Sequence, residues 1–196
     1  MTIREALRWA RERLQASPTP HEDARVLLQH VLDMEHTHVA ADPQRTLSAE
    51  QEERFRALVL RAEELEPIPY ITGEASFYGL EFAVTPAVLI PRPETELLVD
   101  EAVAWAKEHP APLIVDVGTG SGCIAVLLAR RLPQARLLAV DVSQAALAIA
   151  RRNMERHGVA QRIDLRQTTL LEGIEPVDLI VANLPYITDA EWTVLD

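Results

Sequence analysis

The stretch LIVDVGTGSGCIA at positions 113–125 decides the fold of this chain. Its first residues form an apolar run typical of a buried strand, and its last residues begin an apolar helix. Between them, Gly118, Gly120 and Gly122 alternate with small hydroxyl residues. Glycine permits a sharp turn and a close approach of the backbone to a ligand, and a helix N-terminus offers unpaired N–H groups. We therefore expect a ligand-binding loop here rather than an ordinary turn.

The residues around the glycines are compatible with two kinds of ligand. GSGCIA at 120–125 fits the dinucleotide-binding pattern G-x-G-x-x-A. Asp116, two residues before the first glycine, suits the cationic methionyl end of S-adenosylmethionine, and the spacing Asp-x-Gly-x-Gly-x-Gly resembles that of methyltransferases. Asp141 follows the next strand, where an acid binds the hydroxyls of a ribose. Asp141 is disfavoured as a helix cap because Ser143 already supplies that cap.

Strand-like and helix-like segments alternate through the second half of the chain. We expect strands at 113–117, 136–142, 162–167 and 177–182, with helices at 122–132 and 144–158. Near-continuous apolar strands separated by helices predict a parallel sheet with helices on both faces, of the doubly wound α/β class. Ligands of such sheets bind outside the carboxyl ends of the strands, where the glycines and Asp141 lie.

The first half of the chain predicts a separate helical domain. Residues 1–66 contain three amphipathic segments with start signals, which are Thr2 with Glu5, Thr19 with Pro20 and Glu22, and Ser48 with Gln51. Residues 67–92 are rich in Pro, Gly and aromatic residues, and the strand-like runs at 70–71 and 80–84 predict a linker hairpin. The α/β domain then occupies residues 93–196, starting with a helix that has Pro93 near its first position.

Composition restricts the classes of function. The net charge is −11 and Lys107 is the only lysine, which opposes extended binding to a phosphate backbone, although Arg151, Arg152 and Arg156 form a local basic group. The lone Cys123 excludes an internal disulfide. The sequence shows no signal-peptide pattern, no apolar run long enough for a membrane span and no metal-ligand spacing. We expect a cytoplasmic protein without a membrane or metal partner.

The tetrapeptide NLPY at 183–186 closes the last predicted strand and predicts chemistry on a planar nitrogen. The lone pair of such a nitrogen is delocalised, so the group must be oriented and its N–H protons held by acceptors. The Asn183 side-chain oxygen accepts one N–H and the carbonyl of Leu184 accepts the other. Pro185 stiffens the loop and Tyr186 provides a flat face for the planar group. The structural alternative is an Asx turn with Tyr186 packed on the core.

DVGTGSG and NLPY together resemble the class I methyltransferases that modify planar amino groups. FYGLEFAVTPAVLIPRPETELLV at 77–99, with PRPETE as its most specific part, resembles the release factor glutamine methyltransferases. That family transfers a methyl group from S-adenosylmethionine to the glutamine amide in the Gly-Gly-Gln motif of peptide-chain release factors.

The resemblance implies a Rossmann-like domain, a substrate-recognition role for the helical domain, and a monomer when the protein is complete. It implies catalytic roles for Asn183, Pro185 and Tyr186, and substrate contacts from the same three residues and Leu184. The cofactor-binding residues that it implies are Asp116, Gly118, Thr119, Gly120, Ser121, Gly122, Asp141 and Asn183.

The sequence departs from the family pattern in three respects. Leu184 stands where the family usually has proline. TTLL at 168–171 stands where the family typically has Ser-Asp-Trp or Gly-Asp-Leu to hold the adenine, so Thr169 lacks the charge of the expected aspartate. The family's sheet has seven strands, whereas four are predicted here, so we expect a truncated domain with the edge of 177–182 uncovered, and therefore lower solubility and activity.

Three other interpretations stay open. An adenine N6-methyltransferase acting on rRNA or DNA is favoured by NLPY, which that class shares, and opposed by the acidic charge and PRPETE. A non-catalytic cofactor-binding fragment is favoured by the missing strands and TTLL. A nicotinamide oxidoreductase is the weakest, because no hydride-transfer partner is evident.

Overall fold

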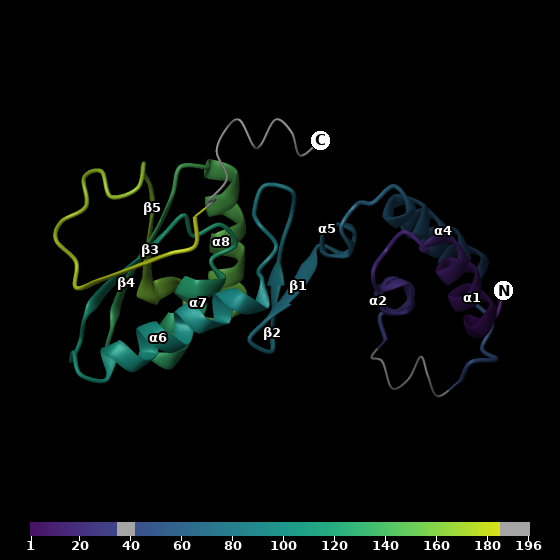
Figure 1. Ribbon diagram of the computed structural model, residues 1–196, viewed down its shortest axis with the longest axis horizontal. Coiled ribbons are helices and arrows are strands. Elements are labelled where there is room, and N and C mark those ends of the chain that lie inside the picture. Colours follow the sequence, from purple (N-terminus) through teal and green to yellow (C-terminus); the bar gives the residue numbers. More distant parts are fainter. Residues whose placement is uncertain (35–41, 185–196) are drawn as a thin grey trace. The chain divides into compact units, whose positions relative to one another are not determined.

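The chain folds into two compact units, Met1–Gly73 and Glu74–Asp196. The structure, a computed structural model shown in Figure 1, describes residues 1–34 and 42–184. Compactness places the boundary at Gly73, so residues 67–92, the expected linker hairpin, are shared between the two units. No helix within the described residues is long and apolar enough to cross a membrane.

The first unit is helical, as the sequence predicts. It contains α1 (Ile3–Arg13), α2 (Pro20–Leu32), α4 (Ala49–Glu63) and α5 (Ile68–Thr72). The apolar stripes of the first three helices meet in one core around the fully buried Phe55. This arrangement buries the periodic apolar residues that defined the helices in the sequence.

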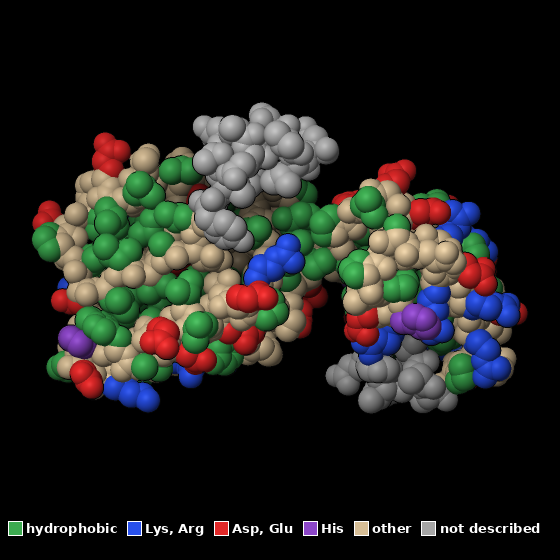
Figure 2. All heavy atoms as spheres, in the orientation of Figure 1, with side chains coloured by type: hydrophobic (Ala, Val, Ile, Leu, Met, Phe, Trp, Pro, Cys, Tyr) green, Lys and Arg blue, Asp and Glu red, His purple; other side chains and the backbone are tan. Residues whose placement is uncertain are grey.

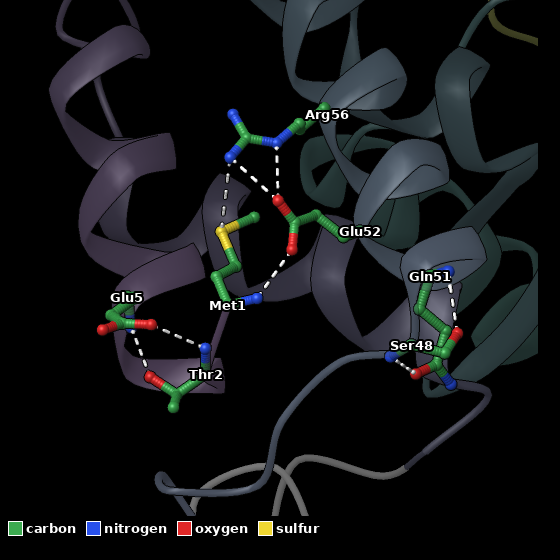
Figure 3. Close-up of polar contacts among 7 residues, drawn as sticks. All are labelled: Met1, Thr2, Glu5, Ser48, Gln51, Glu52 and Arg56. Carbon is green, nitrogen blue, oxygen red and sulfur yellow. Dashed lines mark hydrogen bonds and ion pairs between the residues drawn. The ribbon is translucent and has the colours of Figure 1, made fainter.

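Two capping boxes begin helices of this unit, as predicted. The Thr2 hydroxyl accepts from the Glu5 N–H while the Glu5 carboxylate accepts from the Thr2 N–H, and Ser48 and Gln51 repeat the pattern. Figure 3 also shows the N-terminal ammonium of Met1 donating to Glu52, at 2.6 Å. Glu52 lies on α4, so this contact joins the two helix starts.

The prediction for the start of α2 is right about the positions of Thr19 and Pro20 and wrong about the capping hydrogen bonds. Thr19 occupies the N-cap position and Pro20 the first helical position, but the Thr19 side chain makes no capping hydrogen bond. Its hydroxyl donates to the Asp23 carboxylate at 3.1 Å, and the Ser17 hydroxyl donates to the same carboxylate. Asp23 therefore collects the two hydroxyls, and Glu22 takes no part in a capping box.

The strand predicted at 70–71 is also wrong, because these residues lie in helix α5. Pro69 stands in its first turn, where a missing N–H costs nothing, and Gly73 ends it with φ of +78°. The hairpin instead pairs β1 (Glu74–Phe77) with β2 (Leu80–Ala83), and its turn contains Tyr78 and Gly79 at positive φ. The strand predicted at 80–84 is confirmed.

The second unit contains the predicted parallel sheet. The strands β3 (Leu113–Val117), β4 (Arg136–Asp141), β5 (Ile163–Gln167) and β6 (Leu179–Ala182) lie in the order β5-β4-β3-β6, and all pairs are parallel. The connecting elements are the 3-10 turns η1 (Pro93–Thr95) and η2 (Ala160–Arg162), and the helices α6 (Glu96–Ala106), α7 (Cys123–Arg131) and α8 (Gln144–Arg156). The α/β fold class is thus confirmed, with the first predicted strand in the centre.

The two faces of this sheet are covered differently in the part that the structure describes. Side chains of α6, α7 and α8 form one core with Ile114, Leu137 and Val181. The opposite face, including Val115 and Val140, packs against Ile174 and Val177 of the segment between β5 and β6. The expectation of helices on both faces is therefore met on one face only within the described residues. Figure 2 shows hydrophobic side chains over much of the visible face of this unit.

Asn153 joins three parts of the second unit. This α8 side chain is fully buried, its Oδ1 accepts from the Ala83 N–H at 2.7 Å, and its Nδ2 donates to the carbonyls of Ala83 and Ser121 at 2.9 and 2.8 Å. The amide thus ties the end of β2 and the glycine loop to α8. A buried amide with every partner satisfied specifies one arrangement of these segments.

We predict that Asn153→Ala lowers the free energy of unfolding of the second unit by about 2–4 kcal/mol, because three buried backbone groups lose their partner. Urea unfolding followed by circular dichroism measures the loss. Gln161→Ala, which removes an exposed amide, is the control and is expected to stay within about 0.5 kcal/mol of the parent. Equal stability of the two variants would contradict the assignment.

Candidate active site

The glycine loop and Asn183 lie side by side at the carboxyl edge of the sheet. Strands β3 and β6 pair in parallel with Val117 opposite Ala182, so Gly118 and Asn183 begin neighbouring loops. A Cβ placed on Gly118 would lie 2.5 Å from Cδ2 of Leu184, so the two loops are in contact. The structure therefore brings the predicted cofactor loop and the first two residues of NLPY together.

Each glycine of this loop is required for its own structural reason. Gly118, Gly120 and Gly122 all have positive φ, from +54° to +78°. A Cβ on Gly122 would stand 3.1 Å from that of Ala150, so this glycine lets the start of α7 approach α8 closely. The surface of Gly118 is taken by the Leu184 side chain, which is 38% exposed. A ligand that approaches Gly118 must pack against Leu184 or turn its side chain aside.

Asp141 binds the glycine loop to the end of β4. Its Oδ2 accepts from the Gly120 N–H at 3.0 Å and its Oδ1 accepts from the Ser143 N–H at 2.9 Å. Ser143 caps α8 through the Ala146 N–H, as predicted. Since each carboxylate oxygen can accept more than one hydrogen bond, Asp141 keeps acceptor capacity for a ribose diol.

Asp116 is a buried carboxyl beneath the loop. It is 2% exposed, its Oδ2 accepts from the Thr119 hydroxyl at 2.7 Å, and its Oδ1 has no hydrogen-bond partner. Burial, with a small contribution from the charge of Asp141, raises the pKa of Asp116 to about 6 against the opposing effects of the Thr119 hydroxyl and the nearby backbone N–H of Ala125. A buried carboxylate with an unpaired oxygen is the electrostatic counterpart of a cationic ligand group.

Two more predicted binding residues are buried with Asp116. Thr119 uses its hydroxyl on Asp116, and the Ser121 carbonyl accepts from Asn153. Both side chains are almost inaccessible to solvent, so in this structure they shape the loop from below. Burial also raises the pKa of the neighbouring Cys123 to about 12, which keeps the thiol neutral and unsuited to nucleophilic catalysis.

The Asn183 side chain has a partner that the sequence did not suggest. Its Nδ2 donates to the hydroxyl of Thr95 at 3.0 Å, across a separation of 88 residues. Thr95 lies in PRPETE, the most specific part of the resemblance to the release factor glutamine methyltransferases. Pro185 and Tyr186, the remaining predicted catalytic residues, lie outside the described residues.

The segment 168–171 offers no acidic side chain to an adenine. The Thr168 hydroxyl donates to the carbonyl of Glu172, and Leu170 takes a positive φ of +51°. Next to Asp141, Val142 is 61% exposed and presents an apolar surface at the same edge of the sheet. This segment therefore presents hydroxyl and apolar side chains where the sequence comparison with the family leads us to expect an aspartate.

A hollow among the described residues lies at the other end of the sheet. It has a volume of about 660 Å³ and is lined by residues at the amino ends of the strands, including Leu113, Arg136 and Ile163. Ligands of doubly wound sheets bind at the opposite, carboxyl edge, so the glycine loop is the better candidate. No group of His, Cys, Asp and Glu in the described residues could hold a metal ion.

Comparison with known proteins gives two domain matches. Residues 5–73 match the PrmC N-terminal domain and residues 94–195 match the methyltransferase small domain. A release factor glutamine methyltransferase of Chlorobaculum tepidum is 44% identical over 90% of this chain and 64% of its own length. Those of Koribacter versatilis and Escherichia coli are 40% and 38% identical, over 97% and 93% of this chain and 69% and 67% of theirs. The chain thus spans about two thirds of the length of these relatives.

A solved structure, the ribosomal protein L11 methylase of Lactobacillus delbrueckii subsp. bulgaricus, is 32% identical over 47% of each chain with a TM-score of 0.42.

The buried Asp116 predicts a pH-dependent stability. The pKa of Asp116 in the folded state is higher than in the unfolded chain. The free energy of unfolding therefore falls by about 3 kcal/mol in all as the pH rises from about 4 to 6. Asp116→Asn removes this penalty, so the stability of the variant relative to the parent should rise by about 1–2 kcal/mol from pH 5 to pH 8. Urea unfolding at the two pH values measures it. A difference that does not change with pH would contradict a raised pKa.

Proposed function

This chain belongs to the release factor glutamine methyltransferase family, and we propose that it transfers a methyl group from S-adenosylmethionine to a glutamine side-chain amide. The proposed substrate is the glutamine of the Gly-Gly-Gln motif of peptide-chain release factors. One observation carries the proposal: the loops that begin at Gly118 and at Asn183 are neighbours at the carboxyl edge of the sheet. A donor bound at the first and an acceptor bound at the second would meet.

The described residues fit S-adenosylmethionine. The Oδ1 of the buried Asp116 would offer negative charge to the methionyl end, and the carboxylate of Asp141 would offer acceptors to the ribose. Val142 offers an apolar surface for the adenine. When bound, S-adenosylmethionine would supply a methyl group on a positively charged sulfur. The rest of the cofactor would leave as a neutral thioether. Direct contacts of Thr119 and Ser121 would be through their backbone, because their side chains are buried.

The residues of NLPY would orient the acceptor. An amide nitrogen is a poor nucleophile because its lone pair is shared with the carbonyl group. The Asn183 Oδ1 would accept one N–H and the Leu184 carbonyl the other, while Pro185 and Tyr186 would hold the planar group. Positive charge that develops on the nitrogen would be stabilised by these two oxygens until a proton is lost to solvent. Catalysis is then mainly placement, and no strong base is required.

The remaining expectations about partners follow from this proposal. The helical unit would bind the protein substrate, the protein would act as a cytoplasmic monomer, and no nucleic acid or membrane would be bound stably. An adenine N6-methyltransferase is the second candidate, favoured by Leu184 in NLPY and opposed by the net charge of −11.

We expect radiolabelled S-adenosylmethionine to label a purified release factor and not its Gly-Gly-Gln to Gly-Gly-Ala variant. Scintillation counting of the precipitated protein measures the transfer, and stripped rRNA is the parallel substrate. Label on rRNA alone would support the adenine methyltransferase instead. Binding of the cofactor by calorimetry without any transfer would support the non-catalytic fragment.

We predict that Asn183→Ala lowers kcat about a hundredfold, the usual cost of removing one group that stabilises the transition state. The Kd for S-adenosylmethionine, measured by calorimetry, should change less than about threefold because the variant leaves Asp116, Asp141 and the glycine loop intact. Gln161→Ala is the control and should behave as the parent does. If Asn183→Ala weakened cofactor binding as much as turnover, Asn183 would serve the cofactor and not the acceptor.

A further inference from the structure

The hydrogen bond between Thr95 and Asn183 fixes one side of the proposed acceptor site. Thr95 is 6% exposed, and its Oγ1 accepts from the Asn183 Nδ2 at 3.0 Å. The oxygen and the NH2 group of a side-chain amide are bonded to the same carbon and point in different directions within the amide plane. With the NH2 group held by Thr95, Oδ1 is directed away from Thr95 and stays available to accept another hydrogen bond.

Thr95 is itself held in place by local and distant contacts. It ends the turn η1, where the Thr95 N–H donates to the Arg92 carbonyl at 3.0 Å after Pro93 has fixed the start of the turn. The next residue, Glu96, accepts from the Tyr78 N–H at 2.7 Å at the turn of the β1–β2 hairpin. A hydroxyl placed by such a rigid turn can restrain the amide that it binds.

We propose that Thr95 is a positioning residue, whose hydroxyl holds the Asn183 amide so that Oδ1 faces the N–H of the acceptor. The inference rests on the proposed function, because it names the residue that aims the group through which the acceptor is oriented. Without the hydroxyl, the amide of Asn183 rotates about its terminal bond and presents NH2 to the acceptor in part of the population. A donor facing a donor does not orient the acceptor nitrogen.

The kinetic test compares Thr95→Val, Thr95→Ser and a matched control. Valine keeps the shape of threonine without the hydroxyl, and serine keeps the hydroxyl. Thr85→Val makes the same change on a hydroxyl that accepts from the Ala87 N–H within its own turn. We expect Thr95→Val to lower kcat about tenfold, the value of one ordinary hydrogen bond. The Kd for S-adenosylmethionine should stay within about twofold, and Thr95→Ser and Thr85→Val should retain most of the turnover.

A second test does not depend on activity. Asn153 and Asn183 are the only asparagines in the chain, so labelling with 15N-asparagine gives just two side-chain amides in an NMR spectrum. Asn183→Ala identifies the signal of Asn183, and the buried Asn153 serves as the internal reference. We expect the Asn183 NH2 protons to exchange with solvent at least about tenfold faster in Thr95→Val than in the parent or in Thr95→Ser.

The outcomes separate the inference from the proposed function. Unchanged exchange in Thr95→Val would overturn the inference, whether or not the parent transfers a methyl group. Full turnover of Thr95→Val, or a loss in Thr95→Ser as large as that in Thr95→Val, would overturn it as well. A parent that transfers no methyl to a release factor, with faster exchange in Thr95→Val, would overturn the proposed function and leave the hydrogen bond established.

Discussion

The parallel pairing of β3 with β6 is the constraint on which the candidate site depends. These strands come from segments more than 60 residues apart, yet the pairing of Val117 with Ala182 makes the loops after them neighbours. One loop is built from glycines that expose backbone N–H groups, and the other begins with an amide that can accept from a planar nitrogen. Neither loop alone suggests a transfer reaction. The pairing of β3 with β6 brings the two loops together, so that a donor bound at one could reach an acceptor bound at the other.

The site has a cost in stability that its proposed chemistry explains. Asp116 is buried without a full set of partners, and burial raises its pKa to about 6. A fold selected for stability alone would not keep such a group, because it loses about 3 kcal/mol when it ionises. Binding of a cationic group would return part of that free energy. The carboxyl is therefore understandable as part of a ligand site and not as part of the core.

The sequence predicted the features that depend on local pattern. The parallel sheet follows from the alternation of apolar strands and helices, and the capping boxes of Thr2 and Ser48 follow from residues three apart. The errors arise where local signals compete with one another, and the omissions are contacts between residues far apart in the sequence. The Thr19 hydroxyl donates to Asp23 and therefore does not cap α2. Residues 70–71 lie in a short helix and not in a strand, because two prolines and a glycine favour the start and the end of that helix. The contacts of Asn153 with Ala83 and of Thr95 with Asn183 span 70 and 88 residues, so no local pattern indicates them.

The central claim is that a methyl donor and a planar nitrogen bind at this one edge of the sheet. A crystal structure of the protein with S-adenosylhomocysteine and a Gly-Gly-Gln peptide tests it most directly. We expect the nucleoside on the glycine loop, its ribose on Asp141, and the glutamine nitrogen in hydrogen-bond contact with the Asn183 Oδ1, placed for a methyl to pass across a gap of about 3–3.5 Å. A nucleoside bound at the amino ends of the strands near Arg136, or a glutamine side chain directed away from Asn183, would contradict the account.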